Sequence, residues 1–255
     1  MNYTDGYGQN MYDGNIDINI TNQNVNDNKN MNYHIDTGLI IEKFNVDCEC
    51  PLCEIKKVVE EQFLHEFLND AVMEDNTRIK VGKLGFCDRH FDMLFSRQNK
   101  LSVALQIRTR LNVLSQGITE LKTLKGAKKQ AEYLEKANQT CAICDLTDES
   151  MVKYYKTIAQ MFAKEKDFYK TLIASKGFCM HHYAMLLKYA SSASVFAKNY
   201  VNILSGVQMR AIERIDADLK KFCDKHDYRN ANEPLGSAET ALPRIRTKLY
   251  GKKYD

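Results

Sequence analysis

Apolar residues recur every three or four positions along most of the chain, and this period predicts amphipathic helices. One stripe, just after position 50, consists of Leu52, Ile55, Val58, Val59, Phe63 and Phe67. A longer stripe alternates steps of three and four, as in a coiled coil, and consists of Ala104, Ile107, Leu111, Leu114, Ile118 and Leu121. β-Branched alternation is nearly absent, and none of the 3 prolines falls inside a predicted helix. The pattern therefore predicts an all-α fold.

The same order of stripes returns in the second half of the chain. A stripe of Met151, Tyr154, Ile158 and Met161 or Phe162 is followed by a long one of Val201, Leu204, Val207, Ala211, Ile215, Leu219 and Phe222. We predict two tandem helical repeats, over residues 35–132 and 133–226, packed together through their long amphipathic helices. Residues 1–34 are rich in Asn, Asp, Gly and Tyr and are predicted to be a disordered tail, and residues 227–255 an irregular basic segment.

A motif of cysteine and histidine also occurs twice. The first copy reads Cys50-Pro-Leu-Cys53 followed by Gly85-Phe86-Cys87-Asp88-Arg89-His90, and the second reads Cys141-Ala-Ile-Cys144 followed by Gly177-Phe178-Cys179-Met180-His181-His182. Each copy offers three thiols and one imidazole as two pairs spaced i, i+3, which is the ligand set of a closed tetrahedral zinc site. We therefore predict two zinc ions per chain, one held at helix N-termini within each copy. The predicted ligands are Cys50, Cys53, Cys87 and His90 in the first copy, and Cys141, Cys144, Cys179 and His182 in the second.

Other ligands and another metal are open alternatives. The sequence Cys223-Asp-Lys-His226 resembles the Cys87 to His90 segment, and Cys48 could join it in a partial third site, although no third Cys-x-x-Cys accompanies them. The favoured interpretation is that Cys223 is a small buried thiol, His226 a helix-end histidine and Cys48 a bystander. An iron–sulfur cluster is the alternative to zinc, because Cys-x-x-Cys pairs also hold clusters, though mostly as sets of four cysteines.

The sequence contains no arrangement of nucleophile and base, no phosphate-binding glycine loop and no His-Glu-x-x-His motif, so we do not expect an enzyme.

The favoured hypothesis is a cytoplasmic zinc protein that acts as an interaction or regulatory module with a protein partner. The chain starts without a secretory signal, has no apolar run that could span a membrane and carries a net charge of only +3. A redox protein is the first alternative. Nucleic-acid binding through the basic C-terminal segment and the lysines near 122–129 is the second. The long helices could pair within one chain or between two, so the oligomeric state stays open.

Three sequence features together resemble an uncharacterised bacterial family. They are the segment Asp47-Cys48-Glu49-Cys50-Pro51-Leu52-Cys53, the two Gly-Phe-Cys-x-x-His motifs, and Asp227-Tyr228-Arg229-Asn230. Members of that family, common in clostridia, are filed as a domain of unknown function and sometimes labelled ABC transporter substrate-binding proteins. The resemblance covers about residues 33–250 and implies no established activity. A transporter binding protein of that kind is exported and has two α/β lobes, and this sequence predicts neither feature.

Overall fold

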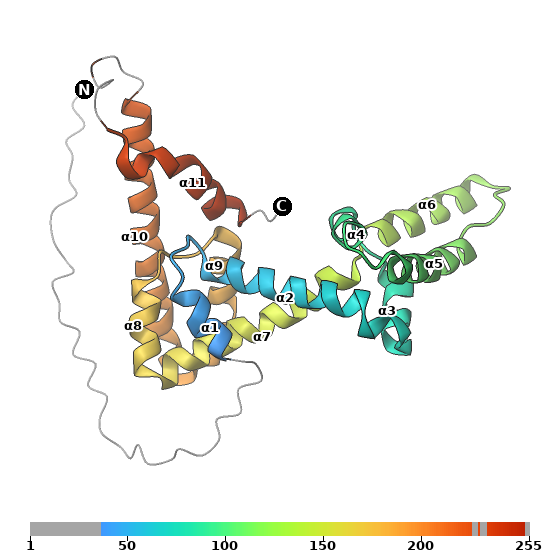
Figure 1. Cartoon of the computed structure of the whole chain (residues 1–255), viewed down its shortest axis with the longest axis horizontal. Helices are drawn as coiled ribbons and strands as arrows, with labels where there is room; N and C mark the ends of the chain where they lie inside the picture. The colour runs from blue at the N-terminus through green and yellow to red at the C-terminus, as the bar shows by residue number, and fades with distance from the viewer. Residues whose placement is uncertain (1–36, 226–228, 230–233, 253–255) are drawn as a thin grey trace, which may run out of the picture. The chain divides into compact units, whose positions relative to one another are not determined.

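The structure, a computed structural model, describes residues 37–225, 229 and 234–252 (Figure 1). The predicted tail at residues 1–34 lies outside the described residues. Every regular element in the described part is a helix, so the predicted all-α fold is confirmed. None of the described helices combines the length and the apolar character that crossing a membrane requires.

The helices of the first half begin with α1 at Thr37–Phe44 and continue with α2 at Pro51–Leu68, the 3₁₀ turn η1 at Asp70–Met73, α3 at Asp75–Leu84, α4 at Asp88–Phe95, α5 at Lys100–Gln116 and α6 at Leu124–Asn138. Those of the second half are α7 at Ala142–Lys164, α8 at Lys166–Ala174, α9 at Met180–Lys188, η2 at Ala190–Phe196, α10 at Ala197–Asp224, η4 at Gly236–Thr240 and α11 at Ala241–Tyr250. Both halves therefore show the same local order, in which a long helix after Cys-x-x-Cys is followed by a shorter helix and then by the helix of Cys-x-x-His.

Helices α2 and α7 form an antiparallel pair that joins the two halves (Figure 1). Lys56 of α2 lies 3.6 Å from the carboxylate of Asp148 in α7. Further along α2, Glu60 bonds to His90, which in turn contacts Cys141, the residue that precedes α7. Residues later in α2 therefore lie beside residues earlier in α7. The N-termini of the two helices lie at opposite ends of the pair.

The hydrophobic core consists of two clusters, and both helices of this pair contribute to each. The larger cluster contains Leu52 and Ile55 from α2 together with the buried stripe of α7 and residues of α1, α8, η2 and α10. The smaller contains Leu64 and Phe67 from the end of α2 together with Ile143 from the start of α7. Each core is therefore built from both halves of the sequence.

The two long helices differ in how much of their predicted apolar stripe they bury. In α10, the residues Leu204, Val207, Ala211 and Ile215 are buried as predicted. In the first half, α5 ends at Gln116, packs mainly on α3, and leaves Leu111 62% exposed; Ile118 and Leu121 lie beyond its end and are also exposed. The regular three-and-four spacing there does not form a packed seam in the described structure.

The C-terminal part of the chain differs from the prediction. Residues 241–250, which we expected to be irregular, form α11. Pro243 stands in the first turn of this helix, where a backbone N–H has no partner within the helix, so the proline is compatible with it. Helix α11 packs against α9, α10 and η4, which brings it next to the second Cys-x-x-His motif.

Candidate metal centres

Four helices begin at a cysteine of the duplicated motif. Cys50, Cys87, Cys141 and Cys179 are the N-cap residues of α2, α4, α7 and α9, and each has an extended backbone. The partially positive N-terminus of a helix favours thiolate over thiol, and thiolate is the form that binds metals. The predicted placement of these cysteines at helix N-termini is confirmed.

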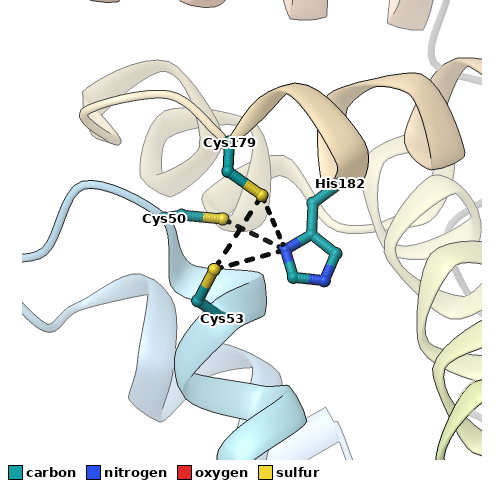
Figure 2. Close-up of side chains that lie close together, drawn as sticks. All are labelled: Cys50, Cys53, Cys179 and His182. Atoms are coloured by element: carbon teal, nitrogen blue, oxygen red, sulfur yellow. Dashed lines mark hydrogen bonds between the residues drawn. The ribbon is translucent and has the colours of Figure 1, made fainter. Parts of the chain in front are cut away.

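Centre A consists of Cys50 and Cys53 from the start of α2 and Cys179 and His182 from the start of α9 (Figure 2). All four side chains are buried. The Nδ1 atom of His182 lies 3.4 Å from the sulfur of Cys50, 3.5 Å from that of Cys53 and 3.2 Å from that of Cys179. The sulfurs of Cys53 and Cys179 are 3.9 Å apart. Three sulfurs and one nitrogen thus face a common point.

Centre B consists of Cys87 and His90 from α4 and Cys141 and Cys144 from α7. Its distances match those of centre A: His90 Nδ1 lies 3.3 Å from the sulfur of Cys87, 3.2 Å from that of Cys141 and 3.3 Å from that of Cys144. The sulfurs of Cys87 and Cys144 are 3.9 Å apart. Cys87 and Cys144 are only partly buried, so centre B lies nearer the surface than centre A.

The structure brings the eight predicted residues together in two groups, but our pairing of them within each copy is wrong. Each centre takes its Cys-x-x-Cys from one copy and its Cys-x-x-His from the other. Helix lengths explain the exchange. At 1.5 Å per residue, the 18 residues of α2 carry the chain about 27 Å from Cys50, and the 10 residues of α3 could return it by only about 15 Å. The chain therefore reaches Gly85 beside the start of α7, where Ala142 N–H donates to its carbonyl at 2.8 Å.

The pKa values of the clustered thiols show that the sulfurs of each centre interact strongly with one another. In centre B, a hydrogen bond from Cys144 and another from His90 lower the pKa of Cys141 to about 3. The pKa of Cys144 is raised, because its hydrogen bond to Cys141 and its burial both favour the thiol. Centre A repeats this division, with the pKa of Cys179 lowered by hydrogen bonds from Cys50 and Cys53. Neighbouring thiolates repel one another, so a bound cation would favour the thiolate form of all three cysteines in either centre.

Both Gly-Phe-Cys loops need a glycine. Gly85 and Gly177 have φ angles of 63° and 84°, in the region that other residues rarely adopt. A Cβ atom at Gly177 would lie 2.6 Å from the Cβ of Ala211, and one at Gly85 would lie 2.7 Å from Nε of Arg110. Each glycine lets the chain turn sharply against a neighbouring helix and deliver the following cysteine to its centre.

The chain was also compared with known protein families and structures. A family model described as a family of unknown function (DUF6062) matches residues 31–255. The chain belongs to this family. No curated protein and no solved structure matches it. Because DUF6062 is a family of unknown function, membership of it assigns no activity to this protein.

A buried carboxylate orients the histidine of centre B. His90 Nε2 lies 2.9 Å from Oε1 of Glu60, which is 3% exposed, and Arg89 donates to Oε2 of the same carboxylate at 3.0 Å. Burial opposes ionisation of Glu60, but the hydrogen bonds from His90 and Arg89 prevail and lower its pKa to about 2. A carboxylate on the outer nitrogen fixes the tautomer and orientation of a ligating histidine. Glu60 stands ten positions after Cys50 in α2. The corresponding residue in α7, ten positions after Cys141, is Met151, so the repeat offers no equivalent carboxylate for His182 of centre A.

In centre A, a buried lysine fastens the two ligand loops to each other. Lys248 of α11 is 1% exposed and donates to the carbonyl of Glu49, which precedes Cys50, and to that of Lys176 at 2.5 Å, shortly before Cys179. The backbone N–H of Lys252 also donates to the sulfur of Cys53 at 3.3 Å. Helix α11 and the residues that directly follow it therefore close centre A.

An arginine has the equivalent position in centre B. Arg110 of α5 donates to the carbonyls of Gly82 at 3.0 Å and Lys83 at 2.6 Å, at the end of α3, and to that of Ala137 at 2.8 Å, near the end of α6. Those two segments lead directly into Cys87 and Cys141. Each centre thus has one cationic side chain that holds the backbone on both sides of it.

The cysteine and histidine motif does not identify Glu60, Lys248 or Arg110. Only Glu60 could have been noticed from the sequence. Glu60 falls next to Val59 in the apolar stripe of α2, where a charged residue has no place unless it has a buried partner. Lys248 and Arg110 lie far from the motifs in sequence and resemble ordinary solvated charges. Their roles depend on tertiary packing.

The three additional candidates do not join either centre among the described residues. Cys48 is half-buried, and burial raises the pKa of its thiol. Cys223 is exposed near the end of α10, so the interpretation of a buried thiol is wrong. His226 lies outside the described residues.

Proposed function

We propose that this protein binds two zinc ions, one in each centre, and that the ions hold its two halves together. The distances between ligand atoms carry the proposal. With Zn–S bonds of about 2.3 Å and tetrahedral angles, two sulfurs lie about 3.8 Å apart, and a sulfur and a nitrogen bonded at about 2.0 Å lie about 3.5 Å apart. One pair of sulfurs in each centre, Cys53 and Cys179 or Cys87 and Cys144, is 3.9 Å apart, and the nitrogen-to-sulfur distances are 3.2–3.5 Å. An iron–sulfur cluster places several irons and sulfides between its ligands, so it needs wider spacing than this.

The ligand set supports a structural role for these ions. Three thiolates and one imidazole complete a tetrahedral shell and leave no position for water or substrate. Each ion would connect the start of one long helix to the Cys-x-x-His helix of the other copy. The free energy of metal binding then contributes directly to the stability of the joined halves.

The biological role that follows is a cytoplasmic interaction or regulatory module with a protein partner. Exposed apolar residues on α5 and around the loop to α6 support this part of the proposal: Leu101 is 69%, Leu111 62% and Leu124 86% exposed. Scattered exposed leucines are common, but a run of them on one helical hairpin is typical of a contact surface. We propose no transporter role, because the described residues form helices only.

Metal content and the visible spectrum of protein purified anaerobically without a metal-binding tag test this proposal. We expect about two zinc ions per chain in a colourless sample. A Cys223→Ser variant is the matched control, because Cys223 is exposed and belongs to neither centre, and it should keep both ions. A brown protein that contains iron and sulfide would overturn the zinc assignment.

A further inference from the structure

A groove of about 420 Å³ lies on the surface of the first half, with α5 on one side and η1 and α3 on the other. Figure 1 shows α3 and α5, the helices that flank it. Its lining includes Met73 of η1, Arg78 of α3, and Leu105 and Arg108 of α5. We call it the α3–α5 groove. It is separate from both metal centres, because none of its lining residues belongs to either of them.

Exposed apolar side chains lie on both sides of the α3–α5 groove. Met73 of η1 is 78% exposed, and Leu105 of α5 is 42% exposed. Leu101, one turn before Leu105, is 69% exposed and continues the apolar surface beyond the groove. A group of large apolar side chains around one groove is typical of a surface that another molecule covers.

The groove is also positively charged. Arg78 and Arg108 are both exposed, and neither forms an ion pair with any described residue. The acidic residues closest to Arg78 in sequence, Glu74 and Asp75, do not line the groove. No carboxylate among the described residues therefore compensates the two arginines within the groove, and this charge favours an acidic occupant.

The position of Arg108 shows what kind of acidic occupant fits. At 3.6 residues per turn, Leu101, Leu105 and Leu111 all lie within about 60° of Arg108 around the axis of α5. Leu111 is 62% exposed, so Arg108 is in the middle of an exposed apolar side. A molecule that covers these leucines also covers the guanidinium group, and a cation removed from water needs a carboxylate or a similar anion as its partner. The occupant must therefore carry an acidic group within an apolar surface.

This requirement excludes or disfavours the other occupants. A second copy of α5 would bring Lys100, Arg108 and Arg110 against the same three cations, because this helix contains no acidic residue. An anionic bilayer holds its charges in the headgroup layer, apart from the acyl chains. A nucleic acid offers phosphates but no aliphatic side chains for Met73 and Leu105.

We propose that the α3–α5 groove binds an amphipathic helix of a protein partner, with acidic residues in or beside its apolar stripe. Apolar side chains of that helix contact Met73 and Leu105, and two of its carboxylates pair with Arg78 and Arg108. A helix suits the groove because the exposed residues of α5 recur every three or four positions, a spacing into which side chains of a second helix fit. The inference rests on the proposed function in one respect, namely that the protein acts through a protein partner.

The test is a selection from a displayed library of amphipathic helical peptides, with the full chain as the target. Each peptide has leucine at every third or fourth position and Glu, Gln or Lys at the positions that flank the leucines. We expect selection to enrich Glu and deplete Lys at the flanking positions, because Arg78 and Arg108 attract carboxylates and repel ammonium groups. Fluorescence anisotropy then gives the dissociation constant of a selected peptide, which we expect to be on the order of 10 μM or tighter.

Variants of the groove separate this site from general attraction of acidic peptides. Arg78→Gln and Arg108→Gln should each weaken binding of the selected peptide about tenfold, the loss expected for one charge-assisted hydrogen bond. Arg210→Gln, at an exposed arginine of α10 that does not line the groove, is the matched control and should bind as the parent does. Circular dichroism should be the same for all of them, because the three arginines are exposed.

A charge exchange tests the pairing directly. Arg108→Glu should abolish binding of the acidic peptide, and replacement of one peptide glutamate by lysine should restore it, because the attraction at that position is reversed. Failure of every such peptide to restore binding would contradict the pairing with Arg108.

The outcomes distinguish this inference from the proposed function. Selected helices that bind the parent and both glutamine variants equally would overturn the α3–α5 groove and leave the role of interaction module in place. Selection of no helix, together with binding of phosphatidylserine vesicles or a DNA duplex, would overturn both. Zinc content is measured separately on the same samples, so a different metal would refute the zinc assignment and not the groove.

Discussion

The exchange of ligands between the two copies predicts how metal content responds to pairs of cysteine substitutions. Cys50 and Cys179 belong to centre A although they come from different copies of the motif, whereas Cys50 and Cys87 come from the same copy and belong to different centres. A Cys50→Ser/Cys179→Ser protein should therefore keep one zinc ion, at centre B. A Cys50→Ser/Cys87→Ser protein should keep none.

The expected size of the effect on stability follows from the loops that the proposed ions would close. Cys53 and Cys179 are 126 residues apart, and Cys87 and Cys144 are 57 apart. The chain-entropy relation used for disulfides can be applied to each ion as a cross-link. For loops of these lengths it gives contributions of about 5 and about 4 kcal/mol to the free energy of unfolding at 25 °C. Either value is a large share of the 5–15 kcal/mol by which a domain is usually stable. Loss of either ion should therefore be plain in a denaturation curve.

The assay is zinc content by mass spectrometry together with urea denaturation of the three single serine variants, at Cys50, Cys87 and Cys179, and the two double variants. Each single variant should bind one ion, and the second substitution in the Cys50/Cys179 pair should add little further destabilisation, because the ion is already lost. The Cys50/Cys87 pair should show the sum of both losses. The reverse result, one ion in the Cys50/Cys87 protein and none in the Cys50/Cys179 protein, would refute the exchanged pairing and support closure within each copy.

Three further substitutions test the surroundings of the centres. Lys248→Met leaves two loop carbonyls without their buried donor and should lower the free energy of unfolding by about 2–4 kcal/mol in urea titrations; an unchanged midpoint would show that Lys248 does not fasten the loops. Glu60→Gln weakens the hold on His90 and should reduce zinc affinity about 10- to 100-fold at centre B alone, and equal losses at both centres in a chelator competition would contradict this role. Gly177→Ala forces a Cβ atom to 2.6 Å from that of Ala211 at a φ of 84° and should cost more than about 1 kcal/mol by thermal melting, so a variant as stable as the parent would contradict the strain argument.

Local features of the sequence predicted local structure well. The period of three and four residues predicted α7 and α10 with their buried residues, because one face of each helix meets a core. The doubled spacing predicted cysteines at helix N-termini, since two ligands three residues apart share one face of a helix. The same rule gave a seam on α5 that has no partner in the described structure, because periodicity shows that a helix has an apolar face and not what covers it.

The pairing of the motifs could not be predicted in this way. Two Cys-x-x-Cys and two Cys-x-x-His segments can combine in two ways that satisfy the same chemistry, and both yield two sets of three cysteines and one histidine. The choice depends on where α3 and α8 end in space. The role of α11 depends likewise on packing, because Lys248 approaches Glu49 from 199 positions away in the sequence.

The exchanged pairing also explains why two similar halves need not form two independent units. Because α2 and α7 are antiparallel, each begins at the end of the pair where the other copy's Cys-x-x-His helix lies, and each supplies residues to both hydrophobic clusters. A half of the chain alone would contain a Cys-x-x-Cys without its Cys-x-x-His partner in reach. Its long helix would also lose its main apolar contacts. Metal binding and packing therefore favour the same joined arrangement.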